Sequence, residues 1–216
     1  MGHQAKAKMT LVRKIESDSD DIRTFKFFGE LAEEVEFLAR PSPCEPGTRK
    51  IYPDPARLSP IERRLLVRSV FSFIEAVVFT LKTTTLMFKK AENLSAGEVA
   101  LAKEEDYELD DSGAVKIRSA RLKFRSNFRF AFALAAKVGE IDWQLNVSDA
   151  GWQALTNALP VRDRLMHPKR AADLVVSDNE IRDAMKAYEW VFDQVGHFAA
   201  SVLLQRRRQR SQERRR

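Results

Sequence analysis

The feature that most constrains the fold of this chain is a repeated helix-start signal, followed each time by apolar residues at helical spacing. The signal is a serine with a glutamate three residues later, and it occurs at Ser59–Glu62, Ser95–Glu98 and Ser177–Glu180. In such a capping box the serine hydroxyl and the glutamate carboxylate bind backbone N–H groups that the first helical turn leaves without partners. A helix is therefore predicted to begin at each of these sites.

Apolar periodicity predicts how far the helices extend. From Ile61 to about Ala91 apolar side chains recur every three or four residues, and Pro60 occupies the first helical position, so we expect a long, deeply buried helix. A second broad apolar face runs from Ile181 to about Leu204. Further helices are predicted over residues 20–39, 119–137 and 149–166.

The predicted fold class is all-α, a bundle of four to six helices. The turn Asp110 to Gly113 has short flanks that either pair as a small hairpin or form a loop over residues 107–117. No alternation of strands and helices that would build a parallel sheet is present. The stripe Phe124, Phe128 and Phe132 alternates with cations, which is typical either of base stacking or of a helix core, and the helical spacing favours the core.

Charge is distributed unevenly along the chain. The formal net charge is +6, but residues 205–216 hold seven arginines and one acid, so removing them from 37 basic and 31 acidic residues leaves 30 of each. We therefore divide the chain into an N-terminal helix with a Pro-rich linker (1–50), a helical domain (51–204) and a basic Arg-rich tail (205–216). The tail either attracts nucleic-acid phosphates or is a solvated end without function.

Several classes of protein are excluded. Cys44 is the single cysteine, so no disulfide framework or multi-cysteine metal site is expected. The basic N-terminal sequence lacks the apolar run of a signal peptide, and no apolar segment is long enough to span a bilayer, so we expect a cytoplasmic protein without a membrane partner. No glycine-rich phosphate loop, nucleophile elbow or histidine cluster occurs, so neither a cofactor nor a metal site is expected. The carboxylates at 104, 105, 110 and 111 are interpreted as a solvated acidic turn, although a magnesium site remains an alternative.

The segment from Arg162 to Pro168 contains the candidate chemistry. It places Arg162, Asp163 and His167, one of three histidines, within six residues. Histidine titrates near neutral pH and can move protons, while a guanidinium binds phosphate oxygens, so the combination suggests phosphodiester chemistry. Pro168 disfavours helical geometry at His167 and should end the helix there, and Pro160 should bend or restart it.

Helical geometry separates the arginine from the histidine. Arg162 and His167 differ by about 140° around a helix, so one protomer would not aim both along one line. Asp163 and His167, four residues apart, can pair, and the carboxylate would then fix the imidazole tautomer. A two-fold axis beside this helix would bring two arginines and two histidines into one cleft, so a homodimer is expected.

Glu75 is the unusual charge of the long helix. It stands among apolar neighbours, and a buried acid needs a partner, for which Arg68 and Arg162 are the candidates. Pairing with Arg162 would make Glu75 a support of the site. The structural alternatives are that His167 only caps a helix end and that Arg162 is an ordinary surface ion-pair partner.

These residues resemble the motif of the HEPN superfamily, in which an arginine is followed by a polar residue, a short spacer and a histidine, late in an all-helical chain. The long helix around Arg68 to Ala76 and the last helix, with Trp190, are similar to the family's helices before and after its motif. The resemblance covers roughly residues 59–204. Lys169 stands where HEPN toxins controlled by nucleotide transfer have a tyrosine, so control by adenylylation is not expected.

The resemblance implies a metal-independent endoribonuclease that acts as a homodimer, as in toxin–antitoxin and phage-defence systems. His167 would move the proton when the RNA 2′-hydroxyl attacks its phosphodiester, Arg162 would hold the phosphate, and Asp163 would orient the site, leaving a 2′,3′-cyclic phosphate. Lys169 and Arg170 either bind substrate or merely follow the helix end. The expected partners are RNA and an antitoxin or other regulatory protein. Because the family also has inactive members, the alternative is a catalytically silent helical module that binds nucleic acid or a protein partner.

Overall fold

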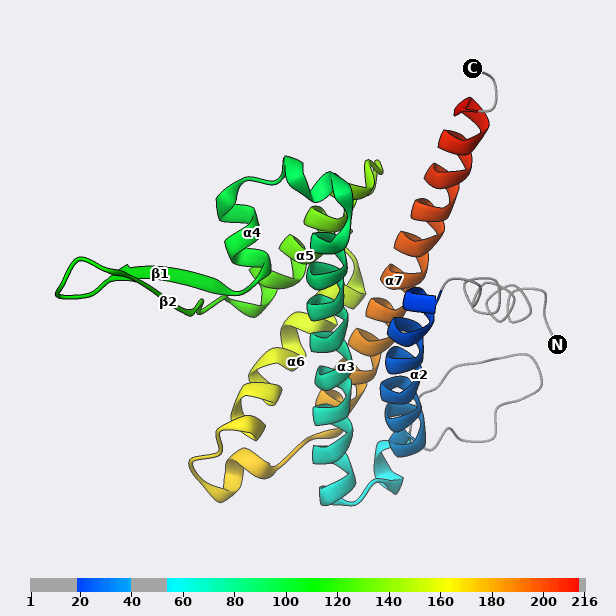
Figure 1. Ribbon diagram of the computed structural model, residues 1–216. Helices are drawn as coiled ribbons and strands as arrows, with labels where there is room; N and C mark the ends of the chain where they lie inside the picture. Colours follow the sequence, from blue (N-terminus) through cyan, green and yellow to red (C-terminus); the bar gives the residue numbers. More distant parts are fainter. Residues whose placement is uncertain (1–18, 40–53, 214–216) are drawn as a thin grey trace. The chain divides into compact units, whose positions relative to one another are not determined.

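The computed structural model of the 216-residue chain describes residues 19–39 and 54–213 (Figure 1). Within these residues it contains six α-helices, three short 3-10 helices and one two-stranded sheet, so the predicted all-α class is confirmed. The α-helices are α2 (Ser19–Ala39), α3 (Pro60–Met87), α4 (Ala96–Ala102), α5 (Phe124–Gly139), α6 (Ala150–Met166) and α7 (Asp178–Glu213). The strands are β1 (Glu105–Leu109) and β2 (Val115–Ser119), and the 3-10 helices are η1 (Pro55–Arg57), η2 (Lys89–Asn93) and η3 (Ala171–Leu174).

All the predicted capping boxes are present at the starts of α3, α4 and α7. At α7, for example, the Ser177 N–H donates to Glu180 Oε2 at 2.8 Å, and the Glu180 N–H donates to Ser177 Oγ at 3.4 Å. The equivalent pairs at the other two helices are Ser59 with Glu62 and Ser95 with Glu98. The predicted start of α6 is also confirmed, because the Asp149 carboxylate accepts the backbone N–H groups of Gly151 and Trp152.

Two helix ends differ from the prediction. Helix α3 ends at Met87 and not near Ala91, after the β-branched run Thr83 to Thr85, and Phe88 takes up extended geometry. Helix α7 does not end near Leu204 but continues through the arginine-rich sequence to Glu213. Arginine and glutamine are good helix formers, so the basic segment extends the helix that precedes it.

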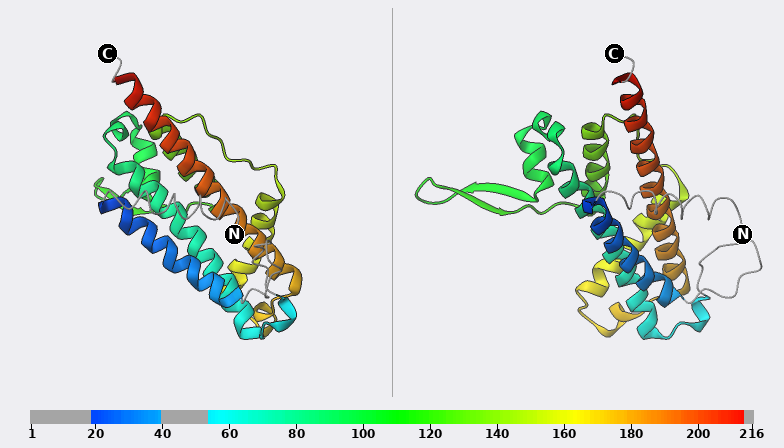
Figure 2. Two further views of the ribbon diagram at one scale, coloured as in Figure 1. Left: turned by 90° about the vertical axis from the view of Figure 1, so that its right-hand side faces the viewer. Right: turned by 45° about the vertical axis from the view of Figure 1, so that its right-hand side comes forward.

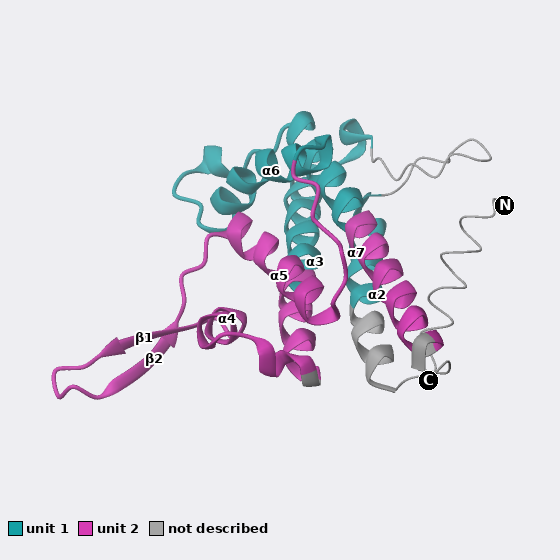
Figure 3. Ribbon diagram, turned by 90° about the horizontal axis from the view of Figure 1, so that it is seen from above, with its two compact units in different colours: residues 1–76, 148–191 teal, residues 77–147, 192–216 magenta. Residues whose placement is uncertain are grey.

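The chain forms two compact units (Figure 3). Unit 1 comprises Met1–Ala76 and Ser148–Val191, and unit 2 comprises Val77–Val147 and Phe192–Arg216. The boundaries fall inside α3 and α7, so each of these helices contributes its first part to unit 1 and its second part to unit 2. This division does not follow the predicted borders at residues 50 and 204, since α2 belongs to unit 1 and the end of α7 to unit 2.

Unit 1 has an apolar core to which segments of α2, α3, α6 and α7 contribute buried side chains. The ring of Phe73 meets Tyr188 of α7 edge-to-face, with centroids 5.0 Å apart, and Phe28 of α2 at 6.3 Å. Both views of Figure 2 show α2 running beside the first part of α3. Helix α6 adds fully buried side chains, including Leu155 and Leu165. Burial of such side chains contributes about 1.5–3 kcal/mol each, which makes this apolar cluster the main stabilising term of the unit.

Unit 2 has its own aromatic core, supplied by α5, α7 and the segment between α5 and α6. Phe128 and Phe132 are fully buried, so the prediction that the Phe stripe is core is confirmed for these two residues. Phe132 stacks on Trp143 with centroids 5.1 Å apart and meets Phe198 of α7 edge-to-face at 5.8 Å. The aromatic rings are therefore occupied by one another and do not form a stacking platform for bases.

Strands β1 and β2 pair as an antiparallel hairpin, which settles the open choice between hairpin and loop. Tyr107 pairs with Ile117 and Leu109 with Val115, and the hairpin extends away from α4 (Figure 1). The Asp110 carboxylate organises the turn by accepting the N–H groups of Ser112 and Ala114 at 2.9 Å. The acidic turn is thus a structural element of the hairpin.

Unit 2 also contains a buried ion pair. The Lys82 ammonium is fully buried and donates to Glu104 Oε1 at 2.5 Å and to Asn127 Oδ1 at 3.1 Å. Glu104 has a positive φ of 58°, which turns the chain from α4 into β1. None of the described helices is both long and apolar enough to cross a membrane.

Candidate functional site

Helix α6 presents the candidate motif in its last two turns. The helix runs without interruption through Pro160, so the predicted restart there is wrong. It ends at Met166, and His167 adopts φ −132° and ψ 59° while its N–H donates to the Asp163 carbonyl at 3.1 Å. The prediction that Pro168 stops the helix at His167 is confirmed.

Arg162 is directed toward α3 and lies between two carboxylates. Its Nη2 donates to Glu75 Oε1, and its Nη1 donates to Asp163 Oδ1 at 2.9 Å. Of the two partners that the sequence offered for Glu75, the structure therefore selects Arg162. The expectation of a deeply buried Glu75 is wrong, because 45% of its side chain is exposed, on the stripe of α3 that points away from the core.

The surroundings keep Arg162 charged. Partial burial lowers the pKa of Arg162, but the hydrogen bond to Asp163 and the charge of Glu75 outweigh it and raise the pKa above its ordinary value. One guanidinium between two carboxylates leaves one net negative charge, which repels a phosphate until one carboxylate turns away. Asp163 is the one that can leave, because 64% of its side chain is exposed.

His167 is exposed, and its imidazole makes no hydrogen bond or ion pair within the described residues. The expected pairing with the Asp163 carboxylate is therefore not formed. The reason is local: His167 has left helical geometry, so the four-residue spacing no longer aligns the two side chains, and Arg162 holds the carboxylate instead. The imidazole is free to meet a ligand from solvent.

The predicted substrate-binding residues follow directly after the helix. The backbone N–H groups of Lys169 and Arg170 donate to Asp173 Oδ2 at 2.8 and 3.2 Å, and Arg170 Nε donates to Asp173 Oδ1 at 3.1 Å. These bonds, that of the Lys169 N–H foremost, lower the pKa of Asp173. The Arg170 charge is thus shared with Asp173, whereas the Lys169 side chain is exposed.

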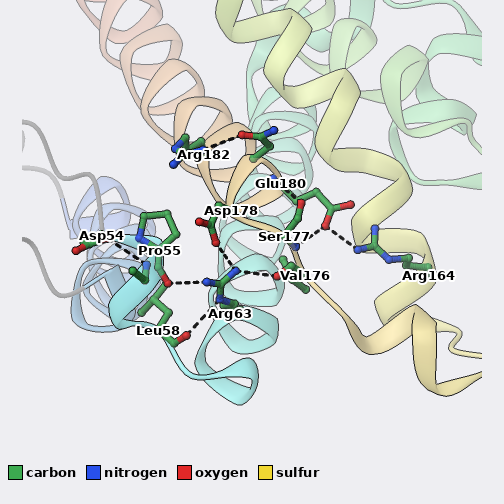
Figure 4. Close-up of polar contacts among 12 residues, drawn as sticks. Asp54, Pro55, Leu58, Arg63, Arg164, Val176, Ser177, Asp178, Glu180 and Arg182 are labelled. Carbon is green, nitrogen blue, oxygen red and sulfur yellow. Dashed lines mark hydrogen bonds and ion pairs between the residues drawn. The ribbon is translucent and has the colours of Figure 1, made fainter.

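Arg68 and Arg164 fix the end of α6. Arg68 does not contact Glu75; its Nη2 donates to the Leu165 carbonyl at 2.9 Å, one of the carbonyls that the helix end leaves open. Arg164 Nη2 donates to the Val175 carbonyl at 2.6 Å. It also donates to Glu180 Oε2 at 2.9 Å (Figure 4). Burial raises the pKa of Glu180, but the bonds from Arg164 and Ser177 outweigh it and lower that pKa overall.

The sequence did not single out Arg164 or Arg63. Arg63 donates to the carbonyls of Pro55, Leu58 and Val176 at 2.8–3.2 Å, and it pairs with Asp178 at 2.7 Å (Figure 4). This arginine joins the start of α3 to the segment before α7, and four of its five N–H donors are directed to protein oxygens. The only advance signal for Arg164 was a cation in the last turn of a helix, where the macrodipole favours it.

No group of three or more potential metal ligands gathers within residues 19–39 and 54–213. Comparisons with protein-family models, curated proteins and solved structures gave no match for this chain.

Proposed function

We propose that this chain is a metal-independent endoribonuclease of HEPN type that works as a cytoplasmic homodimer, in the role of a toxin or defence effector controlled by an antitoxin or regulatory protein. The observation that carries the proposal is the arrangement at the end of α6. Arg162 is held toward α3 by Glu75, and the His167 imidazole, five residues further along the chain, is exposed. A fixed guanidinium and a free imidazole are the groups that cleavage of a phosphodiester by its own 2′-hydroxyl needs.

In the proposed reaction the Arg162 guanidinium binds the scissile phosphate once Asp163 has turned to solvent. One His167 imidazole accepts the proton of the 2′-hydroxyl as its oxygen attacks phosphorus. The second imidazole, from the partner protomer, donates a proton to the departing 5′-oxygen. The products are a 2′,3′-cyclic phosphate and a 5′-hydroxyl, and Lys169 adds positive charge beside the substrate.

The exposed stripe of α3 supports protomer contact beside the motif. Ile61, Leu65, Arg68 and Glu75 recur at helical spacing, and the last two touch the motif end of α6. Ile61 is 61% exposed, Leu65 42% and Met166 of α6 52%. Large apolar side chains exposed around a charged site are typical of an interface that a second protein covers.

The test is cleavage of mixed RNA in EDTA by the purified protein. We expect cleavage with 2′,3′-cyclic phosphate ends, and losses of about 100-fold or more in His167→Ala and Arg162→Ala. The matched controls are His197→Ala and Arg182→Ala, which remove an exposed histidine and an exposed arginine of α7 and should leave the rate unchanged. Cleavage that needs an added metal, or that survives in both motif variants, would contradict the proposal.

A second candidate is a catalytically silent module that binds nucleic acid or a protein partner. The observation in its favour is that Arg162 and Arg170 already have carboxylate partners, whereas Arg207 and Arg208 of α7 are exposed without one in the described part of the chain. This candidate requires inactivity toward many RNAs, together with salt-sensitive binding that disappears in a variant lacking residues 206–216.

A further inference from the structure

A second group of cations lies on unit 2, outside the proposed active site. It consists of Arg121 and Lys123, in the segment between β2 and α5, and Arg125 and Arg129, in the first two turns of α5. All four side chains are exposed, and we call them the α5 basic strip. From residue 119 to residue 139 the chain contains no acid, although the body of the protein is neutral overall.

The backbone brings these cations together over nine consecutive residues, from 121 to 129. Arg125 and Arg129 are four residues apart on one face of α5, about 6 Å along its axis. Lys123 has extended geometry, with φ −67° and ψ 128°, and Leu122 between Arg121 and Lys123 is partly buried. Arg121 lies in a tight turn, in which the Leu122 N–H donates to the Ala120 carbonyl at 3.2 Å, and Lys123 follows directly before the first residue of α5. Figure 3 shows this path from β2 into α5 within unit 2.

The neighbouring carboxylates do not neutralise the strip. Glu104, Glu105 and Asp106, at the base of the hairpin, accept hydrogen bonds from other side chains. Those donors are Lys82 at 2.5 Å, Tyr107 at 2.8 Å and Arg118 at 2.8 Å. The four cations of the strip make no side-chain hydrogen bond or ion pair within the described residues.

The strip opposes the local electrostatics of its own helix. Positive charge at a helix start is unfavourable because that end of the macrodipole is positive, and like charges four residues apart repel. Helix α5 has neither an acid in its first turn nor a side-chain cap, whereas α4 and α6 have a serine or aspartate there. A sequence that breaks a local rule without compensation inside the fold indicates a role in function.

We propose that the α5 basic strip binds the phosphate backbone of RNA. A group of exposed cations without an acid in the same segment suits a polymer that carries one negative charge per nucleotide, and such binding is salt-dependent. Three of the four residues are arginine, whose planar fork donates two hydrogen bonds to one phosphate. The identity of the polyanion rests on the proposed ribonuclease function, but binding by the strip requires neither Arg162 nor His167.

The experiment measures fluorescence anisotropy of a labelled single-stranded RNA of mixed sequence, with His167→Ala present throughout to prevent cleavage. Arg125→Gln/Arg129→Gln should weaken binding at least tenfold and reduce the slope of log K against log salt by about 1.4, since each phosphate contact contributes about 0.7. The matched control is Arg182→Gln/Lys186→Gln, which removes the same charge at the same spacing from the exposed face of α7 and should change affinity less than twofold. Circular dichroism checks that both variants stay folded.

Three outcomes decide the matter. If both double variants weaken RNA binding equally, the affinity depends on net charge alone, and the α5 basic strip is not a specific binding site. Labelled polyglutamate that binds as tightly as RNA and depends equally on Arg125 and Arg129 would identify an acidic polypeptide as the ligand and overturn the assignment. If the wild-type protein never cleaves RNA but binds it through Arg125 and Arg129, the proposed nuclease activity is contradicted, whereas the proposal that the α5 basic strip binds RNA is supported.

Discussion

At Gly151 the packing of unit 1 leaves no room for any side chain. A Cβ at this position would lie 2.1 Å from Trp190 Cγ. Trp190 cannot move aside, because its Nε1 donates to Asp149 Oδ2 at 2.7 Å and its ring packs edge-to-face on Trp152. We expect Gly151→Ala to lower the free energy of unfolding by about 2–3 kcal/mol, measured by urea denaturation.

Gly97 provides the matched control, because no atom lies within 4 Å of the Cβ that would be added there. Gly97→Ala in α4 should raise the free energy of unfolding by about 0.4–1 kcal/mol, since alanine restricts the unfolded chain and favours the helix. Similar effects of the two substitutions would show that close approach to Trp190 is not what requires Gly151.

The ion pair of Lys82 and Glu104 should respond unequally to loss of either partner. Lys82 is fully buried, whereas half of the Glu104 side chain is exposed. Glu104→Ala leaves an uncompensated buried ammonium and should cost about 3 kcal/mol or more, while Lys82→Met fills the same space and lets Glu104 turn to water at a much smaller cost. Denaturation of both variants checks this, and a larger loss in Lys82→Met would contradict it.

The capping box at the start of the short helix α4 makes the stability of the protein dependent on pH. The hydrogen bond from Lys137, followed by those from Ser95, lowers the pKa of Glu98 from 4.5 to about 2. As pH falls from 4.5 to about 2, the unfolded chain takes up the proton first, so the stabilisation by Glu98 is complete above this window and lost through it.

We expect Glu98→Gln to reduce the fall in melting temperature between pH 5 and pH 2.5. The control is Glu92→Gln, which removes an exposed carboxylate of η2 that has no hydrogen-bond partner in the described part of the chain. If the wild type and Glu98→Gln lost stability in parallel as the solution is acidified, Glu98 would not be the group responsible.

Helix starts with a capping box were predictable and helix ends were not, for a physical reason. The start predicted at residue 119, which has no such box, is wrong, because Ser119 belongs to β2 and α5 begins at Phe124. A capping box is complete within four residues, so Ser59, Ser95 and Ser177 mark their helices whatever surrounds them. The end of α3 depends on where tertiary packing stops favouring the helix. The extension of α7 depends on the high helix propensities of arginine and glutamine, which outweigh the repulsion between the arginine charges. Whether the segments on either side of the 110–113 turn pair as a hairpin likewise depends on both segments together, so the turn residues alone did not predict it.

The candidate site divides in the same way. The rule that an acid among apolar neighbours needs a cation offered Arg68 and Arg162 as partners of Glu75 but did not choose between them, and the Glu75 side chain is in fact 45% exposed. The pairing of Asp163 with His167 failed because it assumed regular helix where Pro168 had already ended it. The contacts of Arg63 span more than a hundred residues of sequence, and no local pattern contains that information.

At the scale of the whole molecule, the proposed dimer makes a prediction about mixtures. If the cleft combines Arg162 and His167 from two protomers, Arg162→Ala and His167→Ala each leave it defective. A heterodimer of the two variants retains one arginine to bind the phosphate and one histidine to act as base, and it lacks only the second imidazole, so its rate should stay below that of the wild type. We expect their equimolar mixture to cleave RNA measurably faster than either variant alone, after subunit exchange and in EDTA. A mixture no faster than the mean of its components would show that each site is complete within one protomer.

The borders of the two units could not be predicted from sequence, because they fall inside α3 and α7, where composition does not change. That sharing has a consequence for biosynthesis. Unit 1 needs residues 148–191 to complete the packing of α3, and unit 2 needs the helix that follows Phe192. During translation α3 therefore leaves the ribosome long before the helices α6 and α7 that pack against it. The apolar face of α3 must be protected from aggregation until α7 has emerged. The proposed site, which combines α3 with the end of α6, would therefore form only after His167 had been translated.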